Sequence, residues 1–111
     1  MCSMKFILAI PAYNCAPQLG RLLSSIDDDL AALFSAILVI DNVSSDNTLA
    51  VARQYKGRIK NLHVFRNKRN YSLGGTHKVA FIYAEKIGAT HVAILHGDDQ
   101  AVASELSTDN R

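Results

Sequence analysis

Polar side chains that could do chemistry follow three of the apolar runs in this 111-residue chain. The sequence PAYN occupies residues 11–14 after the first run, Asp41 follows the second, and HGDDQ occupies residues 96–100. The adjacent carboxylates of Asp98 and Asp99 repel each other unless water, hydrogen bonds or a cation compensates their charge. A hard divalent cation that carries a diphosphate would satisfy both carboxylates. An ordinary Asp-Asp turn before a helix explains the pair alone equally well.

Two further features bear on a phosphate or metal site. His96 stands two residues before Asp98, and imidazole is a better ligand for Mn²⁺ than for Mg²⁺; a hydrogen-bonded histidine at a strand end is the alternative. Gly74-Gly75 would open a helix and could approach a phosphate, although a simple turn is the better explanation. The chain has no GxGxxG and no GxxxxGK[ST], which excludes the usual dinucleotide fingerprint and a P-loop.

Apolar periodicity predicts the elements that position these residues. Strands are expected at residues 5–10, 36–40, 62–65 and 91–95. Helices are expected over residues 19–33, 49–55 and 79–87, the last capped by Gly88, and a short helix at residues 101–106. Ser44, Asp46 and Thr48 are expected to cap the second of these helices, and residues 66–75 to form a long polar loop. Residues 27–29, all aspartate, should lie on the polar side of the first helix.

Strands without polar alternation, separated by helices, indicate an α/β fold with a parallel sheet covered on both faces. We expect one domain, a Rossmann-like half with strand order 3-2-1-4. Ligands of such sheets bind beyond the carboxyl ends of the strands, near the point where the strand order reverses. The polar residues above all follow strands, so they should meet at that edge.

The composition limits the classes of function. The hydrophobic content is 49% and the net charge is +2, which excludes a disordered chain, and no apolar run approaches the ~20 residues of a membrane span. Two cysteines without a CxxC pair indicate a reduced, cytosolic compartment. Residues 47–84 contain Lys and Arg but no Asp or Glu. This basic stretch is either a solvated surface or the binding surface for an anionic partner.

Four sequence blocks, taken together and in this order, resemble family 2 glycosyltransferases, which are nucleotide-sugar enzymes of the GT-A fold. The blocks are residues 11–14 (PAYN), 39–48 (VIDNVSSDNT), 70–76 (NYSLGGT) and 95–100 (LHGDDQ). The second resembles the strand-2 motif of that family and the fourth its acidic metal-binding motif. The branch that looks most similar contains dolichyl-phosphate-mannose-synthase-like and cell-wall-biogenesis enzymes.

The resemblance implies a three-layer GT-A fold and assigns roles to individual residues. Tyr13 would flank the nucleotide base, Pro11 and Asn14 would shape its loop, and Asp41 would accept a hydrogen bond from a base N–H. Lys78, and less directly His77, would approach the phosphates. The implied metal ligands for Mn²⁺ or Mg²⁺ are Asp98, Asp99 and His96, where His96 replaces the first aspartate of the family motif.

The resemblance also implies a reaction and its partners. The chain would carry the donor-binding half of an enzyme that moves a sugar from a metal-bound nucleoside diphosphate to a lipid-phosphate or saccharide acceptor. Family enzymes are longer, so residues 1–111 are expected to be one domain truncated relative to the family, without an assignable catalytic residue. The expected location is cytoplasmic, or peripheral at the inner face of the membrane, where residues 66–69 could contact the anionic donor or a lipid phosphate.

Three other functions remain to be weighed. The chain could be a non-catalytic interaction module, including a homo-oligomeric one, that kept the fold. A receiver or flavodoxin-like domain would require an acidic pair or a hydroxyl-rich phosphate loop after the first strand, and residues 11–14 have neither. Nucleic-acid binding is not expected, because the basic stretch lacks interleaved aromatic residues.

Overall fold

The computed structural model describes residues 4–71 and 73–97 of the chain. Strands and helices alternate along this part, as the periodicity predicts. The elements are β1 (Phe6–Ala12), α1 (Ala16–Ser24), α2 (Asp28–Ala31), β2 (Ala36–Asp41), α3 (Thr48–Gln54), β3 (Leu62–Arg66), α4 (Leu73–Lys86) and β4 (His91–Ile94). Within the described ranges, no helix has the length and apolar character needed to cross a membrane.

The four strands form one parallel sheet in the order β3-β2-β1-β4, which confirms the predicted order. β1 and β2 lie in the centre, and their residues from Ile7 to Ile10 and from Ile37 to Ile40 are all fully buried. In the register, Ala12 lies beside Asp41, and Asp41 lies beside Arg66. The carboxyl ends of three neighbouring strands therefore reach the same edge.

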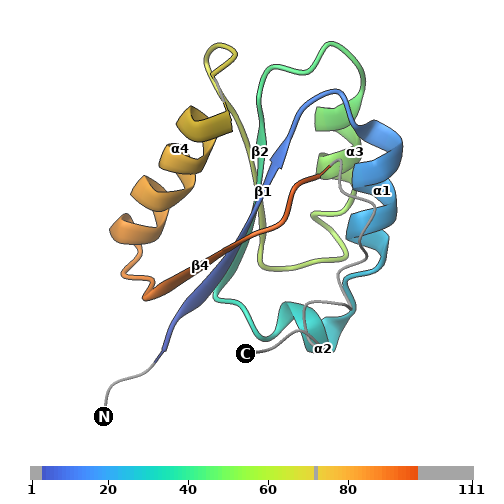
Figure 1. Cartoon of the computed structure of the whole chain (residues 1–111). Helices are drawn as coiled ribbons and strands as arrows, with labels where there is room; N and C mark the ends of the chain where they lie inside the picture. The colour runs from blue at the N-terminus through green and yellow to red at the C-terminus, as the bar shows by residue number, and fades with distance from the viewer. Residues whose placement is uncertain (1–3, 72, 98–111) are drawn as a thin grey trace.

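Each face of the sheet has its own apolar core, so the molecule has three layers (Figure 1). One face is covered by α1, α2 and α3, and its core is centred on residues such as Leu8, Leu19 and Val39. The other face is covered by α4, through Ala80 and Ala84 against Ile7 and Leu38. This double coverage explains why the strands read as continuous apolar runs.

The helix predicted over residues 19–33 is wrong, because the chain breaks there into α1 and α2. The side chain of Asp27 accepts a hydrogen bond from the backbone N–H of Leu30 at 2.8 Å and so starts a new helix. An aspartate that caps a helix favours extended backbone at its own position, which interrupts the preceding helix. Leu33, the last residue of the predicted apolar stripe, is consequently 59% exposed.

The polar loop after β3 is shorter than predicted, because α4 begins at Leu73 and includes Gly74 and Gly75. Its predicted end at Gly88 is confirmed by a φ of 74°. The N–H groups of Gly88 and Ala89 donate to the carbonyls of Glu85 and Ala84 at 3.2 and 2.9 Å, the Schellman arrangement. β1 continues through Pro11, whose carbonyl accepts the N–H of Gly97 at 2.9 Å. The helix predicted at residues 101–106 lies outside the described residues.

Candidate functional site

A pocket of about 240 Å³ lies at the carboxyl edge of the sheet, where the polar residues are predicted to gather. It is lined by Pro11, Ala12, Tyr13, Asn42, Asn70, Thr76 and His96. These residues come from the ends of β1, β2 and β4, from the segment before α4 and from α4 itself. β1 pairs with β2 on one side and β4 on the other, so the pocket opens at the point where the strand order reverses.

Asn14 fixes the loop after β1 to the loop after β2. Its backbone has a positive φ of 47°, and its N–H donates to the Ser44 hydroxyl at 2.9 Å. Its side-chain oxygen accepts the N–H of Ser45 at 2.8 Å. The loop that carries Tyr13, which is 50% exposed, is therefore held in one conformation. This agrees with a shaping role for Asn14, while its contact with a nucleotide stays a prediction.

Asp41 is held inside the protein and does not line the pocket. Its side chain has no exposed surface, and its oxygens accept hydrogen bonds from the Ser44 hydroxyl and, at 3.2 Å, from the Ser44 N–H. The Nε atom of Arg66 lies 3.5 Å from Asp41 Oδ2, the oxygen that also accepts the Ser44 N–H. The structure thus assigns Asp41 internal partners that hold the loop after β2, and its predicted bond to a base stays a prediction.

Asp46 and Thr48 connect the same loops rather than capping α3 in the predicted way. The N-cap of α3 is Asn47, which makes no side-chain cap bond. Asp46 accepts the Thr48 N–H at 3.0 Å and the Thr48 hydroxyl, and the Thr48 oxygen accepts the Cys15 N–H at 2.9 Å. The Thr48 hydroxyl bond, against a smaller opposing desolvation, lowers the pKa of Asp46 below its ordinary value. Asp46 and Thr48 thus join the loop after β2 to the start of α1.

Sequence reasoning missed Asn42, which connects β2 to the segment before α4. Its side-chain N–H₂ donates to the Tyr71 carbonyl at 2.5 Å and the Asn70 side chain at 3.1 Å. Its side-chain oxygen accepts the Tyr71 N–H at 2.8 Å and the Asn67 side chain at 2.9 Å. Its position in the sequence could have indicated this role, because Asn42 directly follows the end of β2 and side chains there reach the edge of the sheet.

Val43 has a φ of 61°, a conformation that a β-branched residue rarely adopts. Such strain costs about 1–3 kcal/mol and persists only where the surroundings enforce it. Here the bonds of Asn42 on one side and of Ser44 on the other hold the backbone. The strained residue marks the turn that separates the pocket residue Asn42 from the buried Asp41.

His96 lies half-buried at the pocket and faces a second histidine, His77 of α4. The two ring centroids are 5.4 Å apart and the ring planes are inclined by 43°. Nε2 of His77 is buried and has no hydrogen-bond partner among the described residues. A histidine pair with an unsatisfied nitrogen fits the ligand chemistry of a divalent cation. No group of three or more His, Cys, Asp or Glu within residues 4–71 and 73–97 could hold a metal.

The remaining predicted residues have different outcomes. Lys78 is exposed and lines a different hollow, beside Phe81 and Ile82 of α4. Asp98 and Asp99 lie outside the described residues, so their role as metal ligands stays a prediction. Pro11 and Tyr13 do line the pocket.

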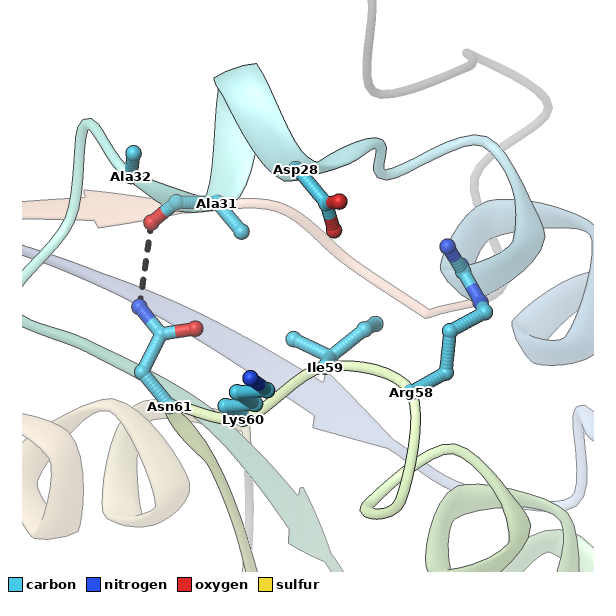
Figure 2. A pocket seen from close by; sticks show the side chains of 7 residues that line it. All are labelled: Asp28, Ala31, Ala32, Arg58, Ile59, Lys60 and Asn61. Carbon is cyan, nitrogen blue, oxygen red and sulfur yellow. Dashed lines mark hydrogen bonds between the residues drawn. The ribbon is translucent and has the colours of Figure 1, made fainter.

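A second pocket, of about 270 Å³, lies between α2 and the segment that leads into β3 (Figure 2). Asn61 donates a hydrogen bond to the Ala31 carbonyl at 3.0 Å across this pocket, and Arg58 donates to the Leu23 carbonyl at 2.5 Å. α2 precedes β2, so this pocket lies at the amino ends of the strands, where parallel sheets rarely bind their ligands. The polar side chains of Asn61 and Arg58 make hydrogen bonds that join this segment to α2 and α1.

Comparison with known proteins shows the family and the fold of the chain. A family profile described as "Glycosyl transferase family 2" matches residues 7–107. The structure of S. aureus TarS 1-349 in complex with UDP-GlcNAc superposes with a TM-score of 0.76 at 28% identity, covering 96% of this chain and 30% of that chain. Its complex with UDP gives the same TM-score and identity, with 31% of that chain covered. No curated protein matches the chain.

A more distant structure shares only the fold. The mannosyltransferase PcManGT from Pyrobaculum calidifontis, in complex with GDP-Man and Mn²⁺, superposes with a TM-score of 0.69 at 21% identity, covering 85% of this chain and 27% of that chain. The chain spans less than a third of the length of TarS 1-349. The profile match over most of the chain, together with the order of the strands, shows that the chain belongs to glycosyl transferase family 2.

Proposed function

We propose that this chain binds the nucleoside diphosphate-sugar donor of a glycosyl transfer in the pocket at the carboxyl edge of the sheet. The observation that carries the proposal is the pocket itself, which combines an exposed aromatic ring, amide groups and an imidazole at the switch point of the sheet. The complexes of TarS with UDP and UDP-GlcNAc support the same class of ligand. The acceptor half of the reaction is not assigned to residues of this chain.

Tyr13 is the residue proposed to contact the base. Its ring is half exposed at the pocket, while the loop beneath it is held by Asn14. Because this loop is already ordered, stacking of a base on the ring carries no entropic cost of ordering the loop. Asn70, which is exposed and lines the pocket, offers an amide to the ribose or base. Asp41 and Asn42 hold the two loops in position, because internal hydrogen bonds occupy their side chains.

A divalent cation beside the diphosphate would supply charge neutralisation to the leaving group. His96 is the described residue proposed to hold it, with Asp98 and Asp99 as its further ligands by resemblance. The unsatisfied Nε2 of His77 beside His96 fits such an ion. The protein itself holds the imidazole of His96 in position, because the N–H of the next residue, Gly97, donates a hydrogen bond to the Pro11 carbonyl.

The basic segment at residues 66–69 is proposed to attract the anionic donor or a lipid-phosphate acceptor. Lys68 and Arg69 are exposed, and the Arg69 guanidinium lies 5.8 Å from the centroid of the Tyr71 ring. Arg66 contributes less free charge, because Asp41 pairs with it. Contact with an anionic membrane surface would use the same cations.

The test is calorimetry of the full chain with a panel of UDP- and GDP-sugars, with and without Mn²⁺. Tyr13→Ala should weaken binding of the best ligand by about 1–3 kcal/mol, the usual contribution of stacking on one base. Phe81→Ala is the matched control, because Phe81 is equally exposed, at 52%, and lies outside the pocket. Absence of heat with every donor, in the presence of the metal, would refute the proposal.

One observation favours a second candidate, a dimeric interaction module. Phe81 and Ile82 of α4 are 52% and 50% exposed beside a hollow that reaches β4, and within the described residues β4 pairs with β1 alone. A second copy would cover this apolar surface. Sedimentation at high concentration distinguishes the candidates: a dimer that Phe81→Asp dissociates, without any nucleotide binding, would favour the module.

A further inference from the structure

The pair formed by His77 and His96 contains a ring nitrogen that packing of the two rings does not satisfy. His77 comes from the second turn of α4, and His96 follows the end of β4. Their centroids lie 5.4 Å apart, and Nε2 of His77 is buried without a partner among the described residues. A buried nitrogen without a partner is rare in native proteins and calls for an explanation.

The separation of the rings matches two imidazoles on one ion. A metal–nitrogen bond of about 2.0–2.1 Å places an imidazole centroid about 3.2 Å from the ion, so two such rings at a tetrahedral angle lie about 5.2 Å apart. The measured value is 5.4 Å. The distance between the two rings is therefore compatible with a shared ion.

Both histidines are positioned by elements that are themselves fixed. The N–H of Gly97 donates to the Pro11 carbonyl at 2.9 Å, directly after His96. Thr76, directly before His77, accepts a hydrogen bond from the Asn67 side chain at 3.3 Å and is 1% exposed. The two rings therefore approach each other from backbones that are ordered independently of any ligand, which lowers the entropic cost of binding.

We propose that His77 and His96 together ligate one divalent cation of borderline softness, such as Zn²⁺ or Co²⁺, so that His77 is a metal ligand of this chain. Two imidazoles bind such ions more tightly than Mn²⁺, and they suit Mg²⁺ poorly because it prefers oxygen ligands. The inference deepens the proposed function. The role of the cation beside the diphosphate rests on that function, whereas the binding of the cation by the two histidines does not. Asp98 lies outside the described residues and is not needed for the argument.

The experiment is titration of the untagged full chain, labelled with ¹⁵N-histidine, with Zn²⁺ alone and with no nucleotide present. Long-range ¹H–¹⁵N NMR spectra report each imidazole nitrogen separately. We expect one nitrogen of His77 and one of His96 to shift together and to saturate at one equivalent. The exposed His63 and His91 serve as internal controls and should stay unchanged.

Variants measure the contribution of each ring. His77→Gln should weaken Zn²⁺ binding about tenfold or more, since loss of even a supporting group costs 10–100-fold in metal affinity. His63→Gln, which removes a histidine elsewhere on the surface, should leave it unchanged. Competition with Mg²⁺ should not displace Zn²⁺ at equal concentrations.

A wild-type titration in which the His77 nitrogens do not shift, or saturate apart from those of His96, would overturn the inference, and so would wild-type affinity in His77→Gln. The first of these results is measured on the wild-type chain, so it does not depend on whether a variant folds. They are also independent of the nucleotide panel: failure of donor binding with joint imidazole shifts refutes the proposed function alone, and the reverse result refutes only the two-histidine site.

Discussion

The side chain of Asn42 makes two reciprocal hydrogen bonds with the backbone of Tyr71, donating to its carbonyl at 2.5 Å and accepting from its N–H at 2.8 Å. An amide side chain thereby pairs with a peptide group as a neighbouring strand would. The two residues lie 29 positions apart in the sequence. Their bonds connect the end of the central strand β2 to the segment before α4.

Replacing Asn42 by alanine should therefore destabilise the protein and weaken ligand binding together. The Tyr71 N–H and the Asn67 amide lose their acceptor, and unsatisfied buried groups cost about 1–3 kcal/mol. Chemical denaturation measures the loss. Asn47→Ala is the control, because Asn47 is exposed and makes no side-chain cap bond; an equal loss in both variants would contradict the role given to Asn42.

Replacing Val43 by glycine should stabilise the protein. The strain of a β-branched residue at a φ of 61° is removed, and glycine's added freedom in the unfolded chain offsets only part of the gain, which leaves about 1 kcal/mol. Thermal unfolding of the variant checks the sign. Val51→Gly within α3 makes the same chemical change at ordinary helical backbone, where the low helix propensity of glycine and the lost packing of the Val51 side chain near Gly20 should destabilise the protein. A lower melting temperature for Val43→Gly would refute the strain.

Replacing Gly97 by alanine should destabilise the protein and displace His96. An added Cβ would lie 3.2 Å from the Pro11 carbonyl oxygen, from the Ala12 Cβ and from the Cys15 Sγ. The backbone carbonyl cannot move without breaking the end of β1, so we expect a cost of about 1–3 kcal/mol. Gly57→Ala is the matched control, because a Cβ there meets nothing within 4 Å. Equal stability of the two variants would count against this tight contact.

The contribution of Asp46 to stability should depend on pH. The bonds from Thr48 lower the pKa of Asp46 in the folded protein, so the stabilisation is full above the ordinary aspartate value of about 4 and is lost as the pH falls through the folded value. The melting temperatures of the wild type and Asp46→Asn should thus differ at neutral pH and converge in acid.

Carboxyl NMR titration tests the cause of that shift. Thr48→Val removes the hydroxyl donor and should return the pKa of Asp46 towards its ordinary value, while Thr48→Ser keeps the hydroxyl and should keep the pKa low. An ordinary Asp46 pKa in the wild type would contradict the hydrogen bonds at this position.

Local sequence was sufficient for the order of the strands and the edge at which the site lies. Continuous apolar runs such as residues 36–40 can be buried only between two layers of helices, and the strand ends then determine where Tyr13, Asn42 and His96 emerge. Gly88 likewise ends α4 as predicted, because its positive φ of 74° suits glycine. The family resemblance pointed to the same edge.

Tertiary structure decided which of these polar residues face the pocket. Asp41 and Asn42 are adjacent, but the strained turn at Val43 and the proximity of Arg66 and Ser44 direct the first inward and the second to Tyr71. The approach of His77 to His96 depends on how α4 packs on the sheet, over a separation that no local pattern encodes. A sequence specifies what each segment can form, whereas long-range packing determines which side chains are left to meet a ligand.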